Sequence, residues 1–217
     1  FVADYQRNHG GFPKPEVAAP SGRSVAVVGS GPAGLTVAEE LVKAGHRVIV
    51  YEAWPRPGGI LVYGIPNFKL DKGIPEAKVA YLEGLGVEFV CNTKLGEDIT
   101  LAQLREEYDA VFLGHGASIG ASASVPGEEL AGDELPAGQQ EPPALGKNVV
   151  IIGGGDTSMD CVRTAVRLSK ERGLGATVTC AYRRTEAEMP GREEERKHAK
   201  DEGVQFKFLT APVKVIG

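Results

Sequence analysis

Cysteine is scarce in this 217-residue sequence, which contains only Cys91, Cys161 and Cys180, all far apart. An odd number of widely spaced cysteines excludes a disulfide framework, a CxxC dithiol centre and a four-cysteine iron–sulfur cluster. We expect all three to be small buried hydrophobic residues. The 4 histidines show no ligand spacing, so the sequence predicts no metal site.

Long apolar runs and an excess of positive charge are also absent. No stretch approaches the roughly 20 apolar residues of a membrane-spanning helix, and residues 1–11 lack the layout of a signal peptide. With 24 Lys+Arg against 29 Asp+Glu, the chain has no broad basic surface for nucleic acid. We expect a cytoplasmic protein with no membrane span and no nucleic-acid partner. Because the sequence does not begin with Met, we also expect it to be part of a longer chain.

The regular part of the sequence begins near Ser24. Residues 25–28 form a continuous apolar run, typical of a strand buried in a parallel sheet. A glycine-rich turn follows, residues 35–42 carry apolar side chains at helical spacing up to Gly45, and residues 48–51 predict a second buried strand. This order predicts a βαβ unit. Further helices are expected over residues 76–83 and 101–107, a further strand over residues 87–91, and another buried strand over residues 110–113.

The same pattern starts again after a segment rich in proline and glycine. The expected elements there are a strand over 149–152, a helix with Met159, Val162 and Val166 on one face, a strand over 177–182, a charged helix with a solvated face over 192–201, and a strand over 204–208. The sequence therefore predicts an α/β protein with two Rossmann-like three-layer nucleotide-binding domains, of which the second is incomplete. We place an N-terminal arm at 1–22, a first domain at 23–125, a linker at 126–146 and a second domain at 147–217.

The first glycine-rich turn carries the dinucleotide fingerprint G-x-G-x-x-G in residues 29–34. In this motif Gly29 permits a tight turn, Gly31 lets a pyrophosphate approach the backbone, and Gly34 allows close packing of helix on strand. Glu52, at the end of the next strand, can accept hydrogen bonds from an adenosine ribose and disfavours a ribose 2′-phosphate.

The second glycine-rich turn, residues 153–158, is a variant in which Ser158 takes the third small position. At the end of the strand that follows, Arg183 and Arg184 stand where an NAD site usually carries an acid. Two guanidinium groups suit a 2′-phosphate, so NADP(H) is favoured over NAD(H). The alternative is that both arginines belong to a solvated basic face opposite nearby glutamates, namely Glu186, Glu188 and residues 193–195.

Two nucleotide folds with different acid and base signatures predict two different dinucleotides. A flavin with a nicotinamide is the chemically useful pair, because hydride passes directly between them. The protein then supplies orientation and electrostatics, so we nominate no catalytic side chain.

Several motifs occur in the order found in one family. The chain resembles the small (β) subunit of NADPH-dependent glutamate synthase and its relatives, which include the FAD/NADPH part of dihydropyrimidine dehydrogenase and the larger subunit of bifurcating ferredoxin:NADP oxidoreductase. The motifs are residues 25–34, Glu52 with Gly58-Gly59, residues 63–66 with Lys69-Leu70, residues 109–116, residues 153–160, and residues 182–184 with 189–191. The family's cysteine-rich cluster domain and its final flavin-contacting segment are not in this sequence.

The resemblance implies FAD in the first domain, NADP(H) in the second, and an iron–sulfur partner domain or subunit within a larger oxidoreductase complex. It implies that the ADP half of FAD is held by Gly29, Gly31, Pro32, Ala33, Gly34 and Glu52. It places Gly59, Leu61, Tyr63, Gly64 and Pro66 on the flavin side, Leu95 at the adenine and Gly116 at the pyrophosphate. It assigns NADPH to Gly154, Asp156, Thr157, Arg183 and Arg184.

Other interpretations remain open on the sequence alone. The chain can be a stand-alone NADPH:ferredoxin reductase, or a non-catalytic subunit whose nucleotide sites only stabilise an assembly. Trp54 and Tyr63 can stack on a cofactor or simply pack in the core. The final electron acceptor is not encoded in these motifs, because one electron-input module serves many substrates.

Overall fold

A computed structural model describes residues 5, 9–11, 14–117, 122, 124–126 and 144–216 of the chain. The chain divides into two compact units, residues 1–118 and residues 119–217. Most of the segment expected to be a linker, residues 126–146, lies outside the described residues. The domain limits at residues 125 and 147 therefore stay a prediction.

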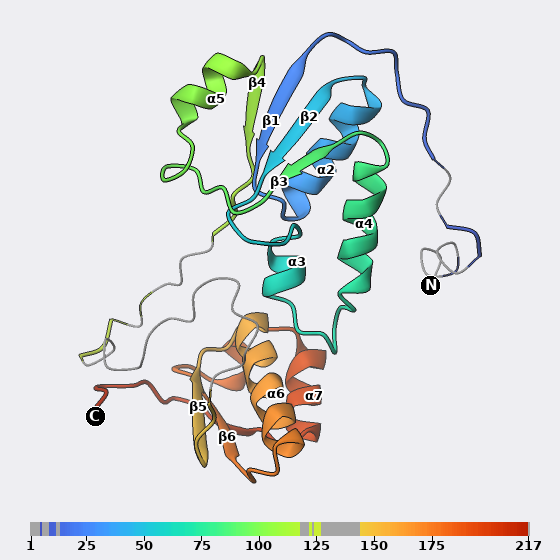
Figure 1. Cartoon of the computed structure of the whole chain (residues 1–217). Helices are drawn as coiled ribbons and strands as arrows, with labels where there is room; N and C mark the ends of the chain where they lie inside the picture. The colour runs from blue at the N-terminus through green and yellow to red at the C-terminus, as the bar shows by residue number, and fades with distance from the viewer. Residues whose placement is uncertain are drawn as a thin grey trace. The chain divides into compact units, whose positions relative to one another are not determined.

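The first unit contains a parallel sheet of strand order β3-β2-β1-β4 between two layers of helices (Figure 1). Its strands are β1 (Ser24–Val28), β2 (Arg47–Tyr51), β3 (Glu88–Val90) and β4 (Ala110–Leu113). Its helices are α2 (Pro32–Lys43), α3 (Ile60–Tyr63), α4 (Gly73–Glu83) and α5 (Leu101–Glu107).

Alternating residues of β1 build a hydrophobic core on each face of this sheet. Val27 packs with residues of α2 and α4, including Leu35 and Leu82, whereas Ala26 and Val28 pack with Leu104 of α5. A strand that is apolar on both faces is the signature of a buried parallel strand. The predicted βαβ unit and its buried strands β1 and β2 are confirmed.

Element ends differ by a few residues from the predicted ones. Helix α4 begins at Gly73 rather than at residue 76, and β3 is limited to Glu88–Val90. The short helix α3 was not expected, because one turn of four residues leaves no apolar period to detect. The turn at Gly45 is as predicted, with a φ of +82° and a bond from its N–H to Val42 O after the last residue of α2.

The prediction that residues 110–113 form a buried strand is wrong. Strand β4 lies at the edge of the sheet, and none of its four residues is buried. Leu113, for example, has 46% of its surface exposed. An apolar run identifies a strand, but its place in the sheet depends on the strand order, which sequence periodicity does not contain.

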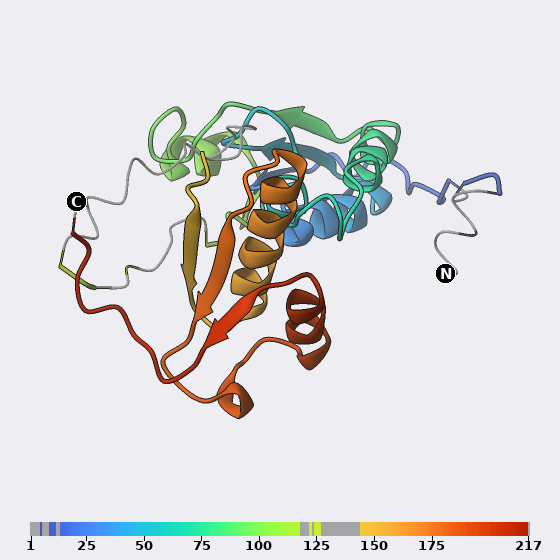
Figure 2. The same ribbon diagram turned by 90° about the horizontal axis from the view of Figure 1, so that it is seen from below.

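The second unit is built around a three-stranded parallel sheet of order β5-β6-β7 (Figure 2). The strands are β5 (Asn148–Ile152), β6 (Thr177–Ala181) and β7 (Gln205–Lys207). The helices are α6 (Asp156–Glu171), the single 3₁₀ turn η2 (Glu186–Glu188) and α7 (Glu193–Asp201). The core on one face contains Met159, Val162 and Val166 of α6, as predicted.

Two expectations need correction. Of the three cysteines, Cys180 is buried, Cys91 of the first unit is half-buried, and Cys161 is exposed. Residue 161 falls between the core-facing positions of α6. The charged helix is also not simply a solvated face. Arg163 of α6 donates to Glu195 at 2.7 Å and to Glu202 at 2.8 Å, and all three side chains are largely buried.

Two broad classes of site find no support in the described part of the chain. None of its helices is long and apolar enough to cross a membrane. Within the same residues, no group of three or more His, Cys, Asp or Glu side chains is arranged to hold a metal ion.

Candidate nucleotide-binding sites

The first glycine loop joins the ends of three strands of the first unit. Gly29 directly follows β1, has a φ of +92°, and donates its N–H to Tyr51 O at the end of β2 over 2.8 Å. A Cβ at Gly29 would lie 2.5 Å from Gly114 O, just beyond β4. Both the backbone angle and the lack of space require glycine here.

Gly34 and Gly31 differ in what surrounds them. A Cβ on Gly34 would lie 1.9 Å from Gly29 O, so glycine is needed for α2 to pack against the loop. A Cβ on Gly31 would meet nothing within 4 Å, and α2 starts there without a hydrogen bond from a capping side chain. The first N–H groups of a helix have no partner within the helix. The open side of Gly31 and the uncapped start of α2 therefore fit an anionic group such as a pyrophosphate.

Glu52 is buried at the end of β2, with 5% of its surface exposed. Its carboxylate accepts hydrogen bonds from Ser30 N at 2.9 Å, from Ser30 Oγ and from Trp54 N at 2.9 Å. Ser30 Oγ in turn accepts a bond from Gly58 N at 2.8 Å. Ser30 thus ties the glycine loop to Glu52 and to the Gly58-Gly59 turn, a role that sequence reasoning missed.

The residues expected on the flavin side follow this turn. Gly59 has a φ of +50°, and a Cβ there would lie 2.8 Å from the Cα of Gly31, so the two glycines are in backbone contact. Leu61 and Tyr63 lie on α3, and Gly64 and Pro66 follow it. The structure therefore brings the start of this predicted set directly against the first glycine loop.

Tyr63 is held by its neighbours rather than left free. Its hydroxyl accepts a bond from Arg56 N at 2.9 Å, and its ring packs edge-on against Trp54 with the centroids 4.5 Å apart. Partial burial raises the pKa of Tyr63 above its ordinary value. Lys72, which was not predicted, donates to Leu61 O at 2.9 Å and to Ile65 O, and so fixes the backbone of the α3 segment.

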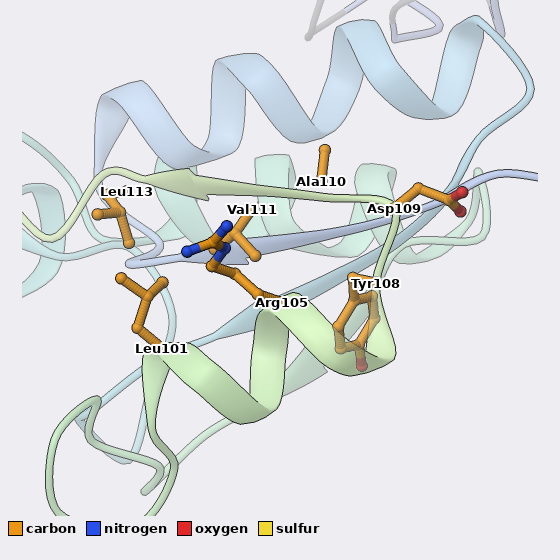
Figure 3. A pocket seen from close by; sticks show the side chains of 7 residues that line it. All are labelled: Leu101, Arg105, Tyr108, Asp109, Ala110, Val111 and Leu113. Atoms are coloured by element: carbon orange, nitrogen blue, oxygen red, sulfur yellow. The ribbon is translucent and has the colours of Figure 1, made fainter.

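The two remaining first-domain residues lie in different settings. Leu95 packs with the cluster of Ala26, Val28 and Leu104 on the α5 side of the sheet. Gly116 follows β4, has a φ of +69°, and has open space around the position of a Cβ. A cavity of about 420 Å³ also opens on this side between α5 and β4, but none of the predicted site residues lines it (Figure 3).

The second glycine loop follows β5 and repeats the geometry of the first. Gly153 has a φ of +141° and donates its N–H to Ala181 O at 3.0 Å, at the end of β6. A Cβ on Gly153 would lie 2.2 Å from Ser158 Oγ, and one on Gly154 would lie 2.6 Å from the ring of Tyr182. Gly155 has open space and precedes α6 without a side-chain cap. This loop fits a second anionic ligand in the same way.

Asp156 and Thr157 form the first turn of α6. Thr157 is exposed. Asp156 accepts hydrogen bonds from Arg192, at 2.9 Å from the backbone N and 3.1 Å from Nε. Arg192 lies just before α7 and was not among the predicted site residues, because no sequence signal connects two residues that meet only in the folded unit.

Arg183 and Arg184 directly follow Tyr182 and are exposed. Within the described residues, neither guanidinium forms a hydrogen bond or a salt bridge. Three glutamates of the alternative interpretation have other partners: Glu186 pairs with Lys200 at 2.5 Å, Glu188 accepts bonds from Thr185, and Glu195 binds Arg163. The Thr185 bonds, with a smaller effect of Arg184, lower the pKa of Glu188.

Residues 23–217 match the protein family described as pyridine nucleotide-disulphide oxidoreductase. The chain belongs to this family. It is 45% identical over 211 residues to the glutamate synthase [NADPH] small chain of Halomonas elongata, a match that covers 90% of this chain and 44% of that protein. It is 37% identical over 205 residues to the NADP(+)-dependent formate dehydrogenase subunit beta of Moorella thermoacetica, covering 90% of this chain and 28% of that protein.

Proteins of known structure share this fold. Mycobacterium tuberculosis FprA in complex with NADPH superimposes with a TM-score of 0.73 at 22% identity, over 90% of this chain and 61% of that chain. This likeness confirms the predicted α/β fold class, and the family match confirms the resemblance to glutamate synthase small subunits. The glutamate synthase small chain and the formate dehydrogenase subunit beta are, by their names, each one chain of a multi-chain enzyme. This chain spans less than half the length of either.

Proposed function

We propose that this chain is the electron-input module of an NADPH-dependent flavoprotein oxidoreductase. One observation carries the proposal: the two glycine loops have opposite charges beside them. A buried carboxylate, Glu52, lies at the first loop, and two exposed guanidinium groups, Arg183 and Arg184, lie near the second. An acid in the first position suits an unphosphorylated ribose and paired arginines suit a 2′-phosphate, so the loops favour FAD and NADP(H) respectively.

The residues of the first loop would hold the ADP half of FAD. The N–H groups of Gly31, Ala33 and Gly34 at the start of α2 would bind the pyrophosphate, with Pro32 as the first residue of the helix and Gly116 on the other side. The turn of Gly58 and Gly59 and the α3 segment would line the flavin, in a backbone conformation that Ser30 and Lys72 fix. Leu95 stays a prediction for the adenine side, because its observed contacts are with the core.

The second loop would hold NADP(H). Gly154 and Thr157 line the start of α6, and Arg183 and Arg184 would bind the 2′-phosphate with charge-assisted hydrogen bonds. The two cofactors, when bound, would supply hydride-transfer chemistry that needs no acid or base from the protein. The residues of this chain would bind and orient the two cofactors, and no side chain is assigned a catalytic role.

The remaining parts of the proposal concern the protein as a whole. The names of the relatives support a place in a multi-chain enzyme, and we propose that electrons leave the flavin for an iron–sulfur domain or subunit. The cytoplasm is the location we propose, from the sequence alone.

Spectroscopy tests the proposed function. The purified protein is supplied with FAD, and unbound FAD is then removed. It should show a flavin absorption band, and NADPH added without oxygen should bleach that band. A band that NADPH bleaches more slowly than NADH does would contradict the NADP(H) assignment. Failure to retain FAD or to bind NADPH would favour the non-catalytic subunit, and direct reduction of added ferredoxin without another subunit would favour the stand-alone reductase.

A further inference from the structure

The segment before α7 crosses the second glycine loop at close range. Gly191 N donates to Gly154 O at 2.9 Å. A Cβ on Gly191 would lie 2.9 Å from Gly154 O and 3.2 Å from the carbonyl carbon of Gly155. The segment and the loop therefore touch backbone to backbone, with no room for a side chain between them.

Arg192 extends this contact to the start of α6. Its backbone N–H donates to one carboxylate oxygen of Asp156 and its Nε to the other, at 2.9 and 3.1 Å. Its third interaction is with Glu195, whose other oxygen Arg163 holds at 2.7 Å. Arg192 is thus fixed both to the glycine loop and to an ion-pair network between α6 and α7.

The carboxylate of Asp156 affects the helix and an anionic ligand in opposite ways. A negative charge in the first turn stabilises a helix. A pyrophosphate binds at the same end of the helix, and an uncompensated carboxylate there repels it. The ion pair with Arg192 brings the local charge of the two side chains to zero, while the open side of Gly155 stays available.

We propose that Arg192 is a positioning residue of the NADP(H) site, which holds Asp156 and cancels its charge so that the second glycine loop accepts a pyrophosphate. This inference rests on the proposed function, because it takes NADP(H) as the ligand of that loop. Arg192 acts through Asp156 and does not itself bind the nucleotide. The family resemblance implied that Asp156 holds NADPH directly. In this proposal Asp156 instead shapes the loop.

A comparison of single and double variants tests the inference. The affinity for NADP⁺ is measured by calorimetry for the unsubstituted protein and for Arg192→Ala, Asp156→Asn and the double variant. Arg192→Ala should bind about tenfold more weakly, because the Asp156 carboxylate then loses the positive charge of Arg192 and repels the pyrophosphate. Asp156→Asn should bind no more weakly than the unsubstituted protein, because the Arg192 guanidinium that it leaves attracts the pyrophosphate. The double variant should recover to within about threefold, since neither charge remains.

Two controls separate charge cancellation from damage to the fold. The ligand 2′-AMP carries the 2′-phosphate but no pyrophosphate, so Arg192→Ala should bind it as the unsubstituted protein does. Arg167→Ala removes an arginine from the same network, but its partner is Glu202 after the end of α7, and it should leave NADP⁺ affinity unchanged. Arg192→Lys should keep part of the affinity that alanine loses.

Each other outcome overturns the inference in an identifiable way. A double variant as weak as Arg192→Ala would mean that Arg192 binds the nucleotide itself. A loss of affinity in Asp156→Asn alone would make Asp156 a direct ligand. Weaker 2′-AMP binding in Arg192→Ala would indicate a displaced fold. If the unsubstituted protein binds neither NADP⁺ nor 2′-AMP, the proposed function fails first.

Discussion

The hydroxyl of Ser30 lies between the carboxylate of Glu52, to which it donates, and the N–H of Gly58, from which it accepts over 2.8 Å. One fully buried side chain thus joins the first glycine loop, the end of β2 and the turn that leads to α3. All three are segments that the proposed FAD site uses. The geometry of that site therefore depends on a residue that occupies a freely variable position of the fingerprint.

Ser30→Ala tests this dependence. Loss of the hydroxyl leaves Gly58 N without its partner and removes one bond from a buried carboxylate, so the free energy of unfolding should fall by about 1–3 kcal/mol. FAD affinity should fall as well, because the Gly58-Gly59 turn is no longer tied to the loop. Urea unfolding and flavin fluorescence measure the two effects. Ser21→Ala is the matched control, because its exposed hydroxyl also has two partners, His46 and the N–H of Arg23, which water can replace, and it should change neither quantity.

Gly31 and Gly34 predict a separation of binding from stability. Gly31→Ala places its Cβ in open space at an ordinary backbone angle, so the free energy of unfolding should change by less than about 1 kcal/mol. FAD affinity should nevertheless fall, because the methyl group occupies the space of the pyrophosphate. Gly34→Ala forces a Cβ against Gly29 O and should destabilise the first unit by about 1–3 kcal/mol or more.

Both variants are measured by urea unfolding without FAD and by FAD titration of the folded protein. Equal destabilisation by the two substitutions would contradict the open space at Gly31. Unchanged FAD affinity in Gly31→Ala would place the pyrophosphate elsewhere.

The first βαβ unit could be predicted because its signals are local. Residues 25–28 are apolar on both faces of a strand, the glycines that follow are spaced for a tight turn and a helix start, and Gly45 ends the helix. Ser30 and Arg192 could not be found this way. Their partners, Gly58 and Asp156, are distant in sequence and meet them only through packing. Likewise, the apolar residues of β4 identify a strand but not its exposed place at the sheet edge.

The network between α6 and α7 predicts how the second unit responds to acid. Partial burial alone raises the pKa of Glu202, but hydrogen bonds from Arg167 and Arg163 outweigh it and leave this pKa below its usual range. A group with a lowered folded-state pKa stabilises the fold above its unfolded pKa, about 4.3 for Glu, and loses that contribution as pH falls through the folded value. Stability should therefore decrease below about pH 4.5.

Glu202→Gln checks the assignment. The substitution removes the carboxylate charge that Arg163 and Arg167 share. The free energy of unfolding should fall by about 1–3 kcal/mol at pH 7, which is less than the loss expected for a fully buried ion pair, because the site is partly exposed. Urea unfolding between neutral and acidic pH should then show a flatter pH dependence for the variant. The same slope in both proteins would assign the acid sensitivity to other carboxylates.

Arg183 and Arg184 predict which pyridine nucleotide the second loop selects. The double variant Arg183→Ala with Arg184→Ala should bind NADPH about 100-fold more weakly, because hydrogen bonds to charged groups contribute about 1.5–3 kcal/mol each. NADH has no 2′-phosphate, so its affinity should change by less than about threefold. Arg172→Ala with Lys197→Ala removes two positive charges from exposed positions elsewhere in the unit and controls for the general electrostatic effect. An equal loss for both nucleotides would show that the arginines support the fold or the pyrophosphate, and the 2′-phosphate assignment would then be wrong.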